Sequence, residues 1–299
     1  MRLPDFLVVG AAKSGTTAIH HYLGQHPQIF LPAQKETNFF AFVGEEVRFE
    51  GPGDEEMARV TITDFEEYGS LFAGASEDQV SGEVSPWYMY FERSAANINT
   101  LIPGVRLIFV LRNPVERAFS SYLHVVRHGR EKLGFREGIL AEEERISRGW
   151  EPIWHYLSAG KYAEQMEPFL KLFGREQVFI GLYDDLRNDP EGFLSDLYGF
   201  LGVDRGFRAD LSLRPNVTGV PRNRVVGHLL FRPNPFKEIA RKMIPQGVRY
   251  PISQELGRRM VVKPSLDPSL RRELVAYYKP EILSLQDLIG RDLSHWFEA

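Results

Sequence analysis

Asp5-Phe-Leu-Val-Val-Gly-Ala-Ala-Lys-Ser-Gly-Thr-Thr-Ala-Ile-His-His-Tyr-Leu23 is the stretch that decides the fold. The apolar run Phe6 to Val9 is typical of a buried parallel strand, and three small residues lead from it into a helix. Small residues let the backbone approach an anion, and the N–H groups at the start of the helix point at it. The stretch therefore predicts an anion-binding loop formed by Lys13, Ser14, Gly15, Thr16 and Thr17.

Strand-like and helix-like segments alternate along the rest of the chain. Residues 106–111 and 177–182 are apolar enough for buried strands, while 162–173, 190–201 and 268–288 have helical periodicity. This alternation favours an α/β fold with a central parallel sheet flanked by helices, similar to P-loop proteins. Because no repeat or linker interrupts the chain, we expect one domain over residues 1–299.

Two stretches do not show a clear period. Residues 44–63 are acidic and contain glycine, which predicts a surface excursion between elements. Residues 213–235 are rich in proline, asparagine and arginine and predict a long functional loop, followed by a basic helix over 236–244. Arg222 in this loop either clamps a ligand or is simply solvated.

Composition excludes several classes of function. The 36 basic residues against 40 acidic ones give a net charge of −4, so no global positive field favours nucleic acid as a partner. The chain has no cysteine, which excludes disulfides, thiolate zinc sites and a cysteine nucleophile. Without a signal peptide or an apolar run of about 18 residues, we expect a cytoplasmic protein without a transmembrane segment, whose membrane contact is at most peripheral.

The identity of the anion depends on spacing and on a second strand. A nucleoside triphosphate loop has Gly, four residues, then Gly-Lys-Ser/Thr, whereas here Lys13 precedes Gly15. An acidic residue that helps to hold Mg²⁺ commonly follows a neighbouring strand, yet the strand at 106–111 ends in Arg112. These features predict a ligand bound without a metal ion. A P-loop-type kinase for a small metabolite and a non-catalytic nucleotide-binding module remain the alternatives.

A second anion site follows from Arg112 and Ser120. Pro114 is typical of the first position of a helix, so Ser120 lies two turns into that helix. The guanidinium as a bidentate donor and the hydroxyl as a further donor can converge on one phosphate. A nucleotide with phosphates at both ends of its ribose would fill this site and the Lys13–Thr17 loop together.

Three motifs carry a family resemblance. Lys13-Ser-Gly-Thr-Thr17, Glu83-Val-Ser-Pro-Trp-Tyr88 and Arg112-Asn-Pro-Val-Glu-Arg-Ala-Phe-Ser-Ser-Tyr122 resemble sulfotransferases that use 3′-phosphoadenosine-5′-phosphosulfate (PAPS), especially the heparan sulfate type and its bacterial relatives. The resemblance covers nearly the whole chain, including residues 183–202 and 293–296.

The resemblance implies roles for the residues singled out above. Lys13 to Thr17 would bind the 5′-phosphosulfate, and Arg112 and Ser120 the 3′-phosphate. Independently of the resemblance, we expect Arg222 to bind the nucleotide from its loop, unless it is solvated. Glu36, in Lys35-Glu-Thr-Asn-Phe-Phe40, corresponds to the catalytic base, unless it is a surface carboxylate paired with Lys35. Lys13 would also act in catalysis, on the oxygen that leaves with the product, 3′,5′-adenosine bisphosphate (PAP).

One departure concerns the acceptor. Eukaryotic heparan-type members carry a lysine after the glutamate that corresponds to Glu83, whereas this chain has Val84. A cation that would position an acidic sugar is therefore missing. We expect a hydroxyl on a small molecule, glycan, lipid or carrier-bound acceptor, and Glu83 itself is either catalytic or structural.

Overall fold

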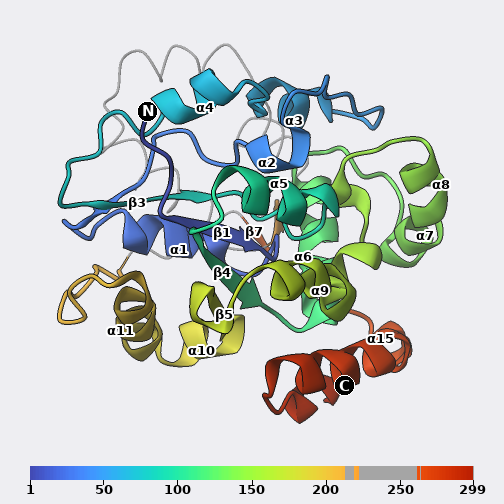
Figure 1. Cartoon of the computed structure of the whole chain (residues 1–299). Helices are drawn as coiled ribbons and strands as arrows, with labels where there is room; N and C mark the ends of the chain where they lie inside the picture. The colour runs from blue at the N-terminus through green and yellow to red at the C-terminus, as the bar shows by residue number, and fades with distance from the viewer. Residues whose placement is uncertain (213–218, 222–260, 263, 299) are drawn as a thin grey trace.

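The centre of the protein is a sheet of five parallel strands, shown in Figure 1. A computed structural model of the chain describes residues 1–212, 219–221, 261–262 and 264–298. The strands are β1 (Phe6–Gly10), β2 (Ile29–Phe30), β3 (Val80–Val84), β4 (Arg106–Leu111) and β5 (Val178–Leu182). Their order is β2-β3-β1-β4-β5, and every pairing is parallel. The predicted α/β fold with helices around a parallel sheet is confirmed.

Alternate residues of the central strands face two separate layers. Phe6 and Val8 of β1 pack with α1 (Thr16–Leu23) and α11 (Pro190–Leu201). Leu7 and Val9 belong to the larger core on the other face, which includes α5 (Arg93–Leu101), α6 (Pro114–Arg127), α9 (Tyr162–Leu172) and α15 (Pro268–Ile289). Burial on both faces explains why β1 and β4 are continuous apolar runs.

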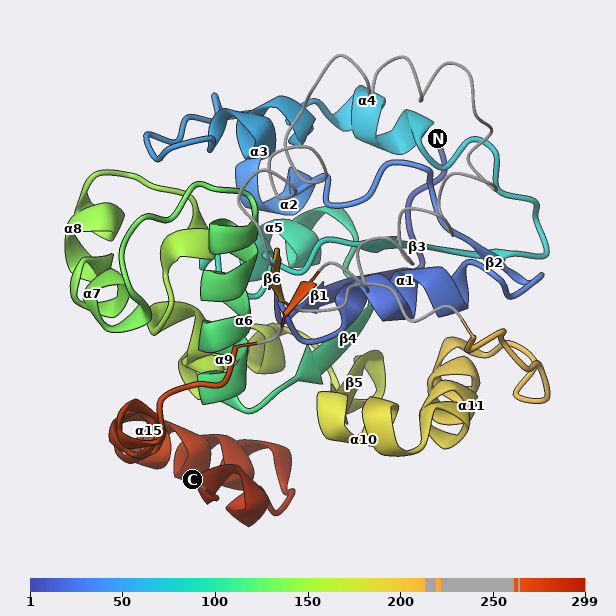
Figure 2. The same cartoon turned by 180° about the vertical axis from the view of Figure 1, so that it is seen from behind.

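Shorter elements surround these layers. Figure 2 shows them from behind: α2 (Phe39–Phe42), α3 (Glu55–Val60), α4 (Phe65–Ser70), α7 (Phe135–Leu140), α8 (Glu142–Ser147), α10 (Tyr183–Asn188), and the antiparallel pair β6 (Val220–Pro221) and β7 (Val261–Val262). The remaining single turns are of the 3₁₀ type: η1 (Pro152–Trp154), η2 (Ser158–Gly160), η3 (Arg175–Gln177) and η4 (Ser294–Phe297).

Local sequence signals fix the start of α6, the helix that carries Ser120. Asn113 is its N-cap, and the Asn113 side-chain oxygen accepts a hydrogen bond from the Val115 amide at 3.0 Å. Pro114 occupies the first turn, where its missing N–H costs nothing. The predicted helix start is therefore confirmed, and it places Arg112 directly before the turn.

The structure differs from the sequence predictions in one loop region. Residues 44–63 contain α3, a helix of six residues in which only Met57 is buried. One buried residue gives no periodic signal, so the helix was not predicted. The predicted loop over 213–235 lies largely outside the described residues, as do the basic helix over 236–244 and Arg222.

Strand order determines where a ligand can bind. The chain leaves β1 towards β2 and β3 on one side, whereas it leaves β4 towards β5 on the other. In open α/β sheets, the crevice for ligands forms at the carboxyl ends of two such neighbouring strands. The Lys13–Thr17 loop follows β1 and Arg112 follows β4, so both lie at this point.

Candidate active site

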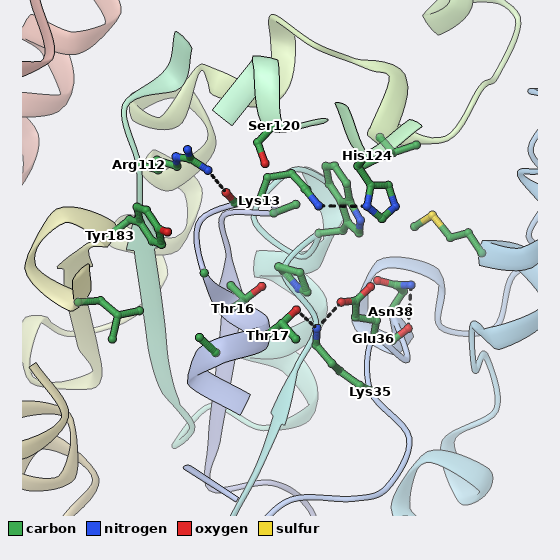
Figure 3. A pocket seen from close by; sticks show the side chains of 18 of the residues that line it. Lys13, Thr16, Thr17, Lys35, Glu36, Asn38, Arg112, Ser120, His124 and Tyr183 are labelled. Carbon is green, nitrogen blue, oxygen red and sulfur yellow. Dashed lines mark hydrogen bonds and ion pairs between the residues drawn. The ribbon is translucent and has the colours of Figure 1, made fainter. Parts of the chain in front are cut away.

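A cavity of about 530 Å³ lies at the carboxyl ends of β1 and β4. Figure 3 shows the residues that line it, drawn from the loop after β1, the segment after β2, α6 and the start of α10. The lining includes Lys13, Gly15, Thr16, Thr17, Lys35, Glu36, Asn38, Arg112, Ser120, His124 and Tyr183. The two anion sites expected from the sequence thus open into one cavity.

Backbone conformation shapes the Lys13–Thr17 loop. Lys13 has φ 71° and Gly15 has φ 92°, both in the left-handed region. A Cβ at Gly15 would lie 2.8 Å from the ring of Tyr183, so only glycine fits between the loop and α10. The side chain of Lys13 consequently points into the cavity and towards α6 (Figure 3).

Lys13 contacts a histidine that the sequence analysis did not single out. Its Nζ lies 3.2 Å from Nδ1 of His124 on α6. Burial, and next the charge of Arg127, lower the pKa of Lys13 from 10.5 to about 7. Burial also holds the pKa of His124 well below its usual range, which makes the neutral imidazole the acceptor of a Lys13 proton. Above pH 7, most Lys13 side chains are therefore neutral unless an anion enters the cavity.

His124 was missed because a lone histidine in a helix is usually a packing residue. The signal that identifies it is its spacing: Ser120 and His124 are four residues apart in α6, and positions i and i+4 share one helix face. If Ser120 faces a ligand, His124 faces the same cavity one turn further along.

Arg112 is fixed by contacts on three sides. Its Nη1 donates to the carbonyl oxygen of Lys13 at 3.2 Å, and its guanidinium lies 4.9 Å from the ring centre of Tyr183. Its Nη2 lies 3.5 Å from a carboxylate oxygen of Glu116. Burial lowers the pKa of Arg112, although a guanidinium stays charged at any physiological pH.

Ser120 completes this end of the cavity. Only 4% of the residue is exposed, and its hydroxyl points towards Lys13 and Arg112 in Figure 3. Arg112 and Ser120 thus line the same cavity, one from the end of β4 and the other from the second turn of α6.

Glu36 lies on the opposite side of the cavity, also in a left-handed conformation with φ 60°. Its carboxylate is 2.6 Å from Nζ of Lys35, which donates in turn to the Thr17 hydroxyl at 2.9 Å. The Asn38 side-chain amide donates to the Glu36 backbone carbonyl at 3.0 Å. The ion pair with Lys35 is therefore present, and the Glu36 side chain is 40% exposed. Through Lys35 and Thr17, Glu36 is also connected to the Lys13–Thr17 loop on the cavity lining.

Glu83 is a buried carboxylate that holds neighbouring segments together. Only 1% of it is exposed, it does not line the cavity, and it accepts hydrogen bonds from four hydroxyl groups. Two come from Tyr68 at 2.7 Å and Tyr88 at 3.0 Å, and the others from Thr37 and Ser85. Since Thr37 follows Glu36, this buried carboxylate holds the segment that presents Glu36.

Ser14 differs from the other loop residues. Its side chain is wholly buried and does not line the cavity, because the loop turns its hydroxyl into the protein interior. Arg222 lies outside the described residues.

The wall beyond His124 is charged and partly apolar. Arg130 pairs with buried Asp54 and with Glu151 at 2.7 Å, above the ring of Trp154. Burial raises the pKa of Glu151 to about 7. Met57, Trp87 and Ile153 supply apolar surface nearby on the lining.

Among the described residues, no cluster of three or more His, Asp or Glu side chains has an arrangement suited to a metal ion. Likewise, no helix in the part of the chain that the structure describes combines the length and apolar character needed to span a membrane.

Comparisons with known proteins agree with one another. A family model described as "Sulfotransferase family" matches residues 4–207. The crystal structure of a sulfotransferase from Alicyclobacillus acidocaldarius is 36% identical, with a TM-score of 0.79 and full coverage of both chains.

Curated relatives are more distant. Membrane-associated sulfotransferase kil1 of Dictyostelium discoideum is 25% identical over 81% of this chain and 64% of its own length. Mouse heparan sulfate glucosamine 3-O-sulfotransferase 3A1 is 27% identical over 68% of this chain and 47% of its own length. The chain thus spans about half to two thirds of the length of these two relatives.

Proposed function

The chain belongs to the sulfotransferase family, and we propose from this that it moves a sulfuryl group from PAPS to a hydroxyl acceptor without a metal ion. The observation that supports the proposal best is the convergence of Lys13, Glu36, Arg112 and Ser120 on one cavity. These residues come from three segments of the sequence. Together they offer two phosphate sites and, on the opposite side of the cavity, the carboxylate of Glu36.

In this proposal the 5′-phosphosulfate lies on the Lys13–Thr17 loop and the 3′-phosphate at Arg112 and Ser120. The start of α1 supplies backbone N–H groups and a positive dipole end to the first group. The guanidinium of Arg112 offers two parallel donors to the second, with Tyr183 stacked behind it. This division is the one that the family resemblance implies, and it is consistent with both groups of residues lining one cavity.

Glu36 acts as the base. The acceptor oxygen forms a bond to sulfur while its proton passes to the Glu36 carboxylate, and the bond between sulfur and the bridging oxygen breaks. Lys13 stabilises the negative charge that develops on that bridging oxygen, which leaves with PAP. Lys35 holds Glu36 in place, since it forms an ion pair with the Glu36 carboxylate and donates a hydrogen bond to the Thr17 hydroxyl.

The acceptor pocket in this proposal is the wall formed by Met57, Trp87, Arg130, Glu151 and Ile153. Among the described residues on this wall, Arg130 is the cation, and two carboxylates already neutralise it. Together with Val84 in place of a lysine, this favours an uncharged hydroxyl compound over an acidic glycan.

Two assays test the proposal. Calorimetry in the presence of a chelator should show that PAP binds. A protein that binds Mg-ATP in a separate titration but does not bind PAP would contradict the proposal and favour a kinase. Transfer of labelled sulfate from PAPS should then be screened on neutral hydroxyl compounds, lipids and acidic glycans. If the protein binds PAP but transfers sulfate to none of these compounds, it is a nucleotide-binding module without catalysis.

A further inference from the structure

We propose that Arg271 and Glu116 form a charge pair that sets the affinity of Arg112 for the 3′-phosphate, so that α15 is a functional part of the nucleotide site. This inference rests on the proposed function, because it needs a phosphate at Arg112. Residue 271 lies beyond the 4–207 segment that the family model matches.

The position of Glu116 raises an electrostatic problem. It lies four residues after Arg112 and four before Ser120, in the first turn of α6. Glu116 and Ser120 share one face of α6, whereas Arg112 precedes the helix and contacts Glu116 directly, so a carboxylate lies beside both groups that are to hold a dianion. Its Oε2 is 3.5 Å from Nη2 of Arg112, which means that it competes with a phosphate for the same donor.

Arg271, near the start of α15, neutralises the charge of Glu116. Its guanidinium is in close contact with Oε1 of Glu116, on the side away from Arg112. Both side chains are about three-quarters buried, with 25% and 27% exposed, so solvent screens the pair only in part. With its charge neutralised by Arg271, Glu116 can orient Arg112 while repelling the phosphate much less.

The C-terminal segment is anchored around this same turn. The backbone carbonyl of Trp296 accepts from the Asn113 side chain at 3.0 Å, and the Trp296 indole donates to Asp184 at 3.1 Å. Arg291 pairs with Asp185 at 2.6 Å. Asn113 follows Arg112, and Asp184 follows Tyr183, the residue on which Arg112 stacks. Residues 268–296 therefore hold the residues on either side of Arg112 and Tyr183 in place, and Arg271 places a positive charge on Glu116, beside Arg112.

The test uses two single variants whose expected effects have opposite signs. Arg271→Gln leaves Glu116 unpaired, so PAP should bind about five- to tenfold more weakly, because a carboxylate that is only partly screened by solvent then repels the phosphate. Glu116→Gln removes the repulsion and should tighten PAP binding, with a steeper dependence on salt. The double variant should lie closer to the wild type than the Arg271→Gln protein does.

Controls separate this role from a structural one. Arg136→Gln breaks the exposed Arg136–Glu273 ion pair, which also joins α15 to the rest of the protein, and it should leave PAP affinity unchanged. AMP, which lacks the 3′-phosphate, should respond less than PAP to either variant. As positioning residues, Arg271 and Glu116 should alter the KM for PAPS while kcat stays near the wild-type value.

Two results would overturn the inference. If Arg271→Gln lowers thermal stability but binds PAP as tightly as Arg136→Gln does, Arg271 is only an anchor for α15. If both single variants shift the affinity in the same direction, Glu116 is no competitor of the phosphate. Failure of the wild-type protein to bind PAP would instead contradict the proposed function, and this inference with it.

Discussion

Binding of PAP should take up a proton, and that proton should go to Lys13. In the free protein the pKa of Lys13 is about 7, because burial and the neighbouring Arg127 disfavour the ammonium form. A phosphate in the cavity brings the opposite charge to the same nitrogen and restores a high pKa. At pH 8 about one tenth of the free protein carries the charge, so binding should take up about 0.9 proton.

Isothermal calorimetry in buffers of different ionisation enthalpy measures this uptake. Proton uptake also makes the affinity depend on pH. Since the charged form of Lys13 is lost as pH rises through 7, PAP binding should weaken by about tenfold per pH unit above 7. The phosphates do not produce this trend, because their second pKa is about 6 and they are fully ionised in that range.

Lys13→Met is the matched control. Glu151 also has a pKa of about 7 and lies on the same cavity, so it is a second group that can exchange a proton on binding. The difference in proton uptake between the wild type and Lys13→Met isolates the contribution of Lys13. The variant should bind PAP more weakly and lose the uptake assigned to Lys13. An affinity that is constant from pH 7 to 9, with heats independent of the buffer, would refute the role of Lys13.

Three further substitutions test the site. Arg112→Ala should weaken PAP binding by more than about 1.4 kcal/mol, measured by calorimetry; an unchanged affinity would place the 3′-phosphate elsewhere. Gly15→Ala should weaken binding by about tenfold or more, because a Cβ meets Tyr183 at a φ that favours glycine; a normal affinity would show that the loop adapts. Glu83→Gln should lower the free energy of unfolding by about 2 kcal/mol in a denaturant titration, since four hydroxyl donors lose their carboxylate acceptor; an unaltered midpoint would contradict the structural role.

The central sheet, and the position of the segments that follow β1 and β4, could be predicted from the sequence. β1 and β4 are continuous apolar runs, and the cationic residues Lys13 and Arg112 follow them. Because carboxyl ends of parallel strands lie at one edge, their convergence follows from topology alone. Pro114 predicted the start of the helix that carries Ser120, and the structure adds Asn113 as its N-cap.

Contacts between distant segments could not be predicted in the same way. His124 meets Lys13 across 111 positions of sequence, and Arg271 meets Glu116 across 155. Neither pair has a local signal, because side-chain partners of this kind depend on how helices pack against the sheet. The role of Glu83 was open for the same reason: its four hydroxyl partners come from three segments.

Sulfate transfer from labelled PAPS, measured in a chelator on wild type and Glu36→Gln, tests the central claim most directly. We expect the wild-type protein to label a hydroxyl acceptor without a divalent metal, and Glu36→Gln to lose this turnover while binding PAP nearly as tightly. Turnover by Glu36→Gln at the wild-type rate would contradict the assignment of the base, and turnover that needs a divalent metal would contradict the proposed mechanism.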